Sequence, residues 1–165
     1  MKEIQLTKGY VALVDDEDYD DLMRWKWSAK EAKNTVYAMR KYRKDGKQIT
    51  ITMHRQLMGA PKGMEVDHID RDGLNNQRAN LRLATHRQNA YNATPQKNKY
   101  GYRGICLHKP SGLYQAQITA KGRFISLGYH KTPEDAARAY DAAAREHHGE
   151  FATLNFPEAV TPVGY

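Results

Sequence analysis

The stretch Glu65-Val-Asp-His-Ile-Asp70, in the middle of a chain of 165 residues, places an acid directly before a histidine. Two asparagines follow: Asn80 lies 12 residues after His68, and Asn89 lies 21 residues after it. An adjacent Asp67 and His68 supply both halves of metal-assisted hydrolysis, because the carboxylate can hold a hard cation and the imidazole can take a proton from water. The pattern therefore predicts a hydrolytic site.

Each of these residues has a simpler interpretation when taken alone. A lone Asp-His pair is usually a hydrogen-bonded turn, Asn80 could be a cap, and Asn89 could be a solvated helix residue. A calcium-binding EF-hand loop is excluded, because its first position would be His68 and its twelfth would be Ala79. The joint spacing in a basic chain favours the hydrolytic site.

The joint pattern resembles the HNH endonucleases, which hydrolyse nucleic-acid phosphodiesters in a ββα-metal site, and the resemblance covers residues 54–92. It implies that His68 is the general base and that Asp67 and Asn89 ligate one Mg²⁺ or Mn²⁺ per active site through oxygen. It also implies that Asn80 orients the loop so that His68 points correctly. The final position holds asparagine instead of histidine, which favours magnesium or manganese over zinc.

The other histidines receive simpler interpretations. His54 is expected to be a packed, hydrogen-bonded scaffold residue. His86 lies close to Asn89 on the expected helix and is a candidate for contact with a phosphate of the substrate. His147 and His148 stand near the end of an expected helix, where a cation suits the helix dipole, and no chemistry is assigned to them.

Composition agrees with a nucleic-acid partner. The net charge is +7 and the pI is about 9.4, which favour association with a polyanion. No apolar run is long enough to span a membrane, and no apolar signal core begins the chain. Cys106 is the only cysteine, so there is neither a disulfide framework nor a cysteine zinc clasp. We expect a cytoplasmic protein of a bacterium or phage-infected cell, monomeric or weakly dimeric, with no evident obligate protein partner.

The pattern along the chain predicts an α+β protein in five parts: a β-rich scaffold over 1–61, an HNH core over 62–93, a linker over 94–99, a DNA-binding domain over 100–157 and a tail over 158–165. In the scaffold we expect strands over 10–14, around Trp25 and Trp27, and over 35–42 and 48–53, with a short helix over 15–23. In the core, a helix should begin near Thr85 and run to about Asn92. The residues support this helix better than a preceding β-hairpin.

The third segment predicts three antiparallel strands, over 102–107, 113–119 and 123–129, packed on one helix. The helix should begin at the Thr132-Pro133 cap and stop before Gly149. Residues 99–131 hold six Lys and Arg and no Asp or Glu, whereas 132–165 are mainly acidic, which indicates a basic face and an acidic face of one small domain.

This segment resembles the AP2 DNA-binding domain of plant transcription factors. The matching pieces are Tyr102-Arg-Gly-Ile105, Tyr114-Gln-Ala-Gln-Ile118, Leu127-Gly-Tyr129, Thr132-Pro-Glu-Asp-Ala-Ala-Arg-Ala-Tyr-Asp141 and Leu154-Asn-Phe-Pro157. The resemblance implies that the sheet lies in the major groove of DNA, with Arg103 contacting a base.

Strand alternation supplies the remaining candidates for DNA contact. If Tyr114, Ala116 and Ile118 pack on the helix, then Gln115, Gln117 and Thr119 face outward. On the next strand Ile125 and Leu127 are expected to pack inward, which leaves Phe124 and Ser126 facing outward. Lys121 and Arg123, at a turn, are better placed for phosphate. Family arginine or tryptophan positions are occupied by Cys106, His108, Phe124 and Ser126, so the plant sequence preference is not expected.

Together these features predict a metal-dependent DNA endonuclease of the mobile (homing) or phage-associated type, with separate cutting and targeting modules. A non-catalytic DNA-binding regulator with a degenerate HNH fold is the alternative. An RNA-binding protein is disfavoured by the duplex-reading resemblance.

Overall fold

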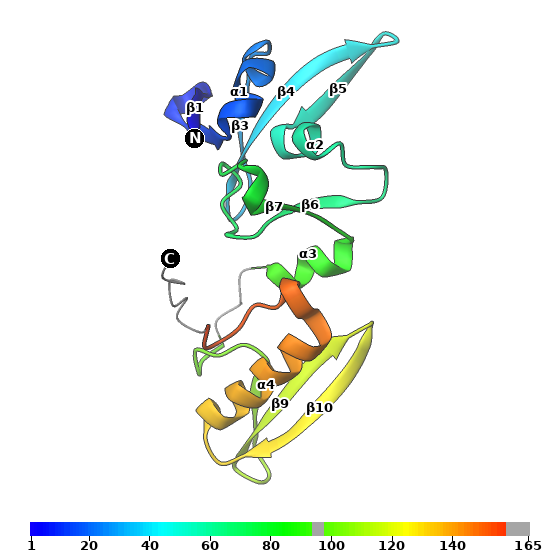
Figure 1. The fold of residues 1–165 in the computed structure, drawn as a ribbon. Coiled ribbons are helices and arrows are strands. Elements are labelled where there is room, and N and C mark those ends of the chain that lie inside the picture. Colours follow the sequence, from blue (N-terminus) through cyan, green and yellow to red (C-terminus); the bar gives the residue numbers. More distant parts are fainter. Residues whose placement is uncertain (94–97, 158–165) are drawn as a thin grey trace, which may run out of the picture. The chain divides into compact units, whose positions relative to one another are not determined.

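The computed structural model describes residues 1–93 and 98–157 and divides the chain into two compact units, Met1–Ala90 and Tyr91–Tyr165 (Figure 1). Residues 94–97 of the expected linker and 158–165 of the expected tail lie outside the described residues. The predicted α+β class is confirmed, since short antiparallel sheets are combined with helices. Among the described helices, none is long and apolar enough to cross a membrane.

The first unit carries three small antiparallel sheets, with strand orders β1-β2, β3-β4-β5 and β6-β7. Their strands are β1 (Lys2–Gln5), β2 (Val11–Val14), β3 (Ser28–Glu31), β4 (Val36–Lys44), β5 (Lys47–Thr52), β6 (Glu65–His68) and β7 (Leu81–Ala84). The helices are α1 (Asp16–Met23), α2 (Met53–Met58) and α3 (His86–Asn92), with short 3₁₀ turns at Thr7–Gly9 and Arg78–Asn80.

Several sequence predictions for this unit need correction. The strand expected around Trp25 and Trp27 is wrong: β3 begins at Ser28, and the two tryptophans lie in the turn that precedes it. Trp27 is nonetheless buried, and its Nε1 donates to the Leu22 carbonyl at 2.9 Å. The sequence analysis also missed β1 and α2, and it assigned Met53 to a strand although Met53 begins α2.

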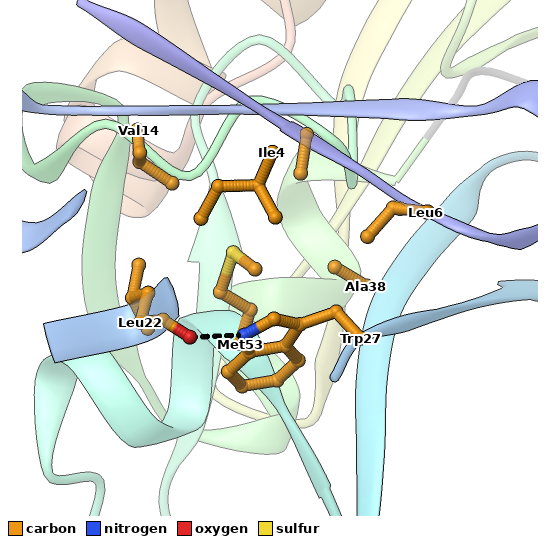
Figure 2. Packing of buried hydrophobic residues seen from close by; sticks show 8 residues of the cluster. Ile4, Leu6, Val14, Leu22, Trp27, Ala38 and Met53 are labelled. Carbon is orange, nitrogen blue, oxygen red and sulfur yellow. Dashed lines mark hydrogen bonds between the residues drawn. The ribbon is translucent and has the colours of Figure 1, made fainter. Parts of the chain in front are cut away.

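The core of the first unit is built by residues from three strands (β1, β2 and β4), two helices (α1 and α2) and the connections between them. Trp27 and Met53 lie at its centre in Figure 2, and the indole packs beside α1. The buried cluster comprises Ile4, Leu6, Ala12, Val14, Leu22, Trp27, Ala38 and Met53. It joins the N-terminal hairpin to α2, which precedes the β6–β7 hairpin and is connected to it by residues 59–64.

The second unit has a three-stranded antiparallel sheet of order β10-β9-β8 and one long helix. Its elements are β8 (Ile105–His108), β9 (Leu113–Ala120), β10 (Arg123–His130), α4 (Pro133–His148) and a 3₁₀ turn at Gly149–Phe151. The α4 helix begins as the sequence predicts, because the Thr132 hydroxyl accepts from the Asp135 amide at 3.1 Å. Alanines at 136, 137, 143 and 144 line its buried face and allow a close approach to the sheet.

Candidate active site and DNA-facing sheet

A hairpin followed by a helix carries the predicted catalytic residues. Strands β6 and β7 pair antiparallel, with Asp67 opposite Arg82 and His68 opposite Leu81. The α3 helix follows β7 at once and is started by Thr85, whose hydroxyl accepts from the Gln88 amide at 3.3 Å. The Gln88 side chain returns the contact by accepting from the Thr85 amide at 2.9 Å, so the two residues form a capping box.

Asp67 lies inside the protein and is held by an arginine. Both Nε and Nη2 of Arg82 donate to its Oδ2, at 2.8 and 2.7 Å. The two side chains are only 5% and 11% exposed, for Asp67 and Arg82 respectively, so the charges stabilise each other away from bulk water. The carboxylate expected to hold a metal is therefore fixed in place by its cross-strand neighbour.

Asn89 is oriented by Glu65, a residue that the sequence analysis did not single out. The Asn89 Nδ2 donates to Glu65 Oε2 at 2.6 Å, while His86 Nδ1 lies 2.8 Å from Glu65 Oε1. The pKa of the Glu65 carboxyl is lowered, chiefly by the hydrogen bond from Asn89 and further by His86, against a partial desolvation. Glu65 and Asp67 share one face of β6, because strand residues two apart point the same way.

His68 stands at the end of β6 within a group of buried rings. Its ring centroid lies 4.8 Å from that of His54, in an edge-on arrangement, and 5.9 Å from that of Tyr37. Burial lowers the pKa of His68, while hydrogen bonding by Asn76 and the neighbouring carboxylates oppose this shift. The imidazole is thus favoured in its neutral form, which is the form that can accept a proton.

His54 is the packed, hydrogen-bonded histidine that its sequence context suggests. Its Nε2 lies 2.8 Å from the Thr52 hydroxyl, and its ring meets Tyr37 edge-on at 5.3 Å. Burial lowers its pKa to about 3, helped by the nearby His68 and Arg55. Tyr37 itself has a raised pKa, because it is desolvated and close to Asp67 and Glu65.

Asn80 fastens the loop between the two strands. Its Oδ1 accepts from the Asp70 amide at 3.0 Å, and its Nδ2 donates to the Asp70 carboxylate and the Asn75 carbonyl, each at 2.9 Å. The loop also docks on the scaffold at Gly73, where an added Cβ would lie 2.5 Å from the Val36 carbonyl. These contacts fix the backbone that immediately follows His68.

The donor set fits a magnesium-type ion better than a metal that needs many protein ligands. Among residues 1–93 and 98–157, no group of three or more His, Cys, Asp or Glu side chains is arranged to hold a metal. Mg²⁺ is commonly held by one or two carboxylates, with water and substrate phosphate completing its shell. The buried carboxylate of Asp67 and the side-chain amide of Asn89 carry oxygen donors of this kind.

In the second unit, one face of the sheet carries the five side chains that alternation predicted to face outward, namely Gln115, Gln117, Thr119, Phe124 and Ser126. Phe124 is opposite Thr119 and Ser126 is opposite Gln117, while Ala116, Ile118 and Ala120 are buried on the other face. Gln115 Nε2 donates to the Ser126 hydroxyl at 3.2 Å, which links the neighbouring strands on this face. Phe124 is 62% exposed on this face.

Tyr129 joins this face through an irregularity that alternation alone does not predict. The register shifts between Ser126 and Tyr129, so Tyr129 pairs with Gln115 and is 50% exposed. Gly128, with φ of 94°, lies within that shift and was the available sequence signal for a bulge.

The predicted basic contacts divide into two groups. Lys121 and Arg123 are exposed at the β9–β10 turn, where Lys121 has φ of 51°. Arg103 is partly buried, and its Nη1 donates to the Ala93 carbonyl at 3.0 Å. Burial raises the pKa of Tyr140 of α4, and Arg103, which also hydrogen-bonds this tyrosine, opposes part of the rise. These contacts hold the guanidinium beside Tyr140 of α4.

Known proteins resemble both parts of the chain. Residues 53–91 match the family described as HNH endonuclease. The uncharacterized HNH endonuclease L560 of Acanthamoeba polyphaga mimivirus is 32% identical over 149 residues, covering 90% of this chain and 76% of that protein. Protein 3.8 of Escherichia phage T7 is 37% identical over 93 residues, covering 56% of this chain and 76% of the phage protein. The chain belongs to the HNH endonuclease family.

Plant transcription factors match a smaller part of the chain, in its C-terminal region. The AP2-like ethylene-responsive transcription factor At1g79700 of Arabidopsis thaliana is 38% identical over 73 residues. That match covers 38% of this chain and 24% of the plant protein. The AP2-like resemblance of residues 100–157 is supported by this homology.

Proposed function

We propose that this protein is a divalent-metal-dependent DNA endonuclease that hydrolyses phosphodiester bonds and is targeted to duplex DNA by its AP2-like region. The proposal rests on one observation: direct contacts fix the candidate metal ligands on the β6–β7 hairpin and α3. Arg82 donates to Asp67, and Asn89 donates to Glu65. His68 is the last residue of β6, and its burial lowers the pKa of the imidazole and so favours the neutral form.

His68 acts as general base and removes a proton from the attacking water as the new P–O bond forms. A bound Mg²⁺ or Mn²⁺, held by Asp67 and Asn89, would supply charge stabilisation at the phosphate and at the departing 3′ oxygen. The Asn89 amide nitrogen donates to Glu65, and this orientation leaves the amide oxygen to bind the metal ion. Asn80 keeps the loop after His68 in one conformation.

The sheet face of the second unit supplies affinity for the duplex. Gln115, Gln117 and Thr119 offer polar groups to base edges, and Phe124 and Ser126 lie on the adjoining strand. Lys121 and Arg123 bind phosphates beside them. Arg103 keeps the base contact implied by the resemblance only if its guanidinium leaves the Ala93 carbonyl.

The protein would act on DNA in the cytoplasm of a bacterial or phage-infected cell, as a monomer or weak dimer. One active site per chain makes single-strand nicking the natural first event. We keep the divisions 1–61, 62–93 and 100–157 as proposed functional segments. The HNH match, over residues 53–91, begins near the end of the first and covers most of the second.

A non-catalytic DNA-binding regulator is the competing function. One observation favours it: Asp67 already has a strong partner in Arg82, which a metal would have to share or displace. The neutral ring of His68 beside it favours catalysis.

Plasmid nicking tests the choice. Supercoiled DNA should be nicked with Mg²⁺ or Mn²⁺ and not with EDTA, and His68→Ala should lower the rate by roughly 10²- to 10⁴-fold, the usual contribution of a general base. His147→Ala, which alters a histidine outside the site, is the matched control and should keep full activity.

Because His68 is buried, His68→Gln should be assayed as well, with a thermal melt to show that both variants fold. Full metal-dependent nicking by a folded His68 variant would exclude this residue as the base. The absence of metal-dependent nicking in the unaltered protein would favour the regulator.

A further inference from the structure

The hairpin of β4 and β5 in the first unit extends well beyond the end of β3, the third strand of their sheet. Strand β4 has 9 residues and β5 has 6, while the neighbouring β3 has only 4 and pairs with the first part of β4 (Figure 1). Asp45 and Gly46 form the two-residue turn, with φ of 51° and 72°, and Lys44 pairs with Lys47 across it. Both positive φ values are those of a type I′ turn, which suits the strand twist and fixes the register.

The two faces of this hairpin differ in their surroundings. On one face, Ala38 is buried in the core, and the Arg40 guanidinium lies 4.0 Å from the centroid of the Trp25 ring and 4.9 Å from that of Tyr42. On the other face, Lys41 and Arg43 are exposed. Their partners on β5, Thr50 and Gln48, are exposed as well.

The exposed face continues directly from the candidate active site. Tyr37 lies on the same side of β4 as Lys41 and Arg43, by strand alternation, and its ring is 5.9 Å from that of His68. At about 3.3 Å per residue, the six residues from Tyr37 to Arg43 span roughly 20 Å. That distance corresponds to about six base pairs of duplex.

The charge of this strip is unbalanced. Neither β4 nor β5 contains an Asp or Glu, and within the described ranges no carboxylate forms an ion pair with Lys41 or Arg43. Only Asp45, in the turn, is acidic. Cations without acidic partners, spaced along an extended ribbon, match a line of phosphates.

We infer that the outer face of the β4–β5 hairpin, through Lys41 and Arg43 with Gln48 and Thr50, binds the phosphate backbone of duplex DNA next to the bond that is cut. The inference rests on the proposed function for the identity of that bond. The surface adds a contact in the nuclease unit itself, independent of the AP2-like sheet, and it would align the substrate along the strand that leads to His68.

Binding in an uncleaving background tests this surface. The full chain with His68→Ala would be titrated, by fluorescence anisotropy in EDTA, with a labelled mixed-sequence duplex of about 40 base pairs at several salt concentrations. Adding Lys41→Gln and Arg43→Gln should weaken binding about tenfold at 0.1 M salt and reduce the slope of log K against log salt by about 2, one for each lost phosphate contact.

The matched control removes the same two charge types elsewhere in the unit. Arg24→Gln with Lys26→Gln alters two exposed side chains before β3 and should leave the affinity and the salt slope unchanged. If neither the hairpin variant nor the control loses affinity, the inference is overturned. If both lose the same affinity, it is overturned too, because the effect would then come from net charge alone.

Failure of the proposed function would be seen separately. If the unaltered protein nicks no plasmid, the endonuclease assignment fails, while the binding comparison still decides whether the hairpin contacts duplex. If nicking occurs and the hairpin variant binds as tightly as the control, only the hairpin assignment fails.

Discussion

The candidate functional residues of the two compact units differ in their burial. In the first, Asp67 and His68 are about 95% buried, and each is fixed by neighbouring side chains. In the second, the candidate contact residues lie on an open sheet face, with Phe124 and Tyr129 at least half exposed.

The difference follows from what each unit would have to do. A general base and a metal ligand must be held within a fraction of an ångström, which requires packing and buried hydrogen bonds. A groove-reading surface must remain open to solvent until DNA covers it, so its interactions are made only in the complex. Three experiments test how separate these two arrangements are.

The largest effect should come from the buried ion pair of the first unit. Arg82→Ala leaves the buried Asp67 carboxylate without its arginine and should lower the free energy of unfolding by about 3–5 kcal/mol. Arg78→Ala breaks a comparable two-contact pair with Asp18, but Arg78 is 52% exposed, so its cost should stay below about 1 kcal/mol.

Tryptophan fluorescence measures this effect selectively, because both tryptophans, Trp25 and Trp27, lie in the first unit. Denaturant titration should show a much lower midpoint for the Arg82 variant than for the Arg78 variant. Equal midpoints would mean that burial of the Asp67 pair has no energetic consequence.

A steric change should act on the second unit alone. A Cβ at Gly104, where φ is 75°, would lie 1.9 Å from Tyr140 Cδ2, so Gly104→Ala should cost about 2–4 kcal/mol through overlap and backbone strain. At Gly112, where φ is 69°, an added Cβ would meet no atom within 4 Å, so Gly112→Ala should cost only about 1 kcal/mol.

Far-ultraviolet circular dichroism should register the loss of α4 in the Gly104 variant at a lower temperature, while the tryptophan transition stays in place. A joint shift of both signals would show that the two units unfold together.

The third effect concerns pH. His54 has a pKa of about 3 in the folded protein and an ordinary value of 6.5, so the folded state binds fewer protons than the unfolded state between these values. The free energy of unfolding should therefore fall as pH falls from about 6.5 toward 4, by at most about 1.4 kcal/mol per pH unit from this residue.

His54→Gln keeps a side chain able to hydrogen-bond Thr52 and removes this contribution. Urea titrations at several pH values should give a shallower pH dependence for the variant than for the unaltered protein. Parallel curves would show that His54 is protonated as readily when folded as when unfolded.

Local sequence rules predicted the elements whose signals lie within a few residues. The Thr132-Pro133 start of α4, the Thr85 start of α3 and the Asp45-Gly46 turn are all present, because caps and tight turns depend on neighbouring residues. Alternation likewise predicted the outward face of β9, since Ala116 and Ile118 are buried and Thr119 is exposed.

Other features depended on contacts between distant segments. Trp27 seemed to belong to a strand, yet its burial comes from packing on α1 and α2. Strand β1 is stabilised by pairing with β2 and by the burial of Ile4 in the core. The partners Glu65 and Arg82 could not be assigned without the register of β6 and β7. Tyr129 needed the bulge beside Gly128 to reach the outer face.

The sequence by itself determined which chemical groups this protein possesses: an acid–histidine pair with two spaced asparagines, a basic chain, and two recognisable segments. Only the tertiary structure decided which partners fix those groups, namely Arg82 for Asp67, Glu65 for Asn89, and Tyr37 and His54 for the ring of His68. The physical reason is that residue type is local, whereas burial, charge pairing and orientation arise when strands far apart in the chain are brought into register.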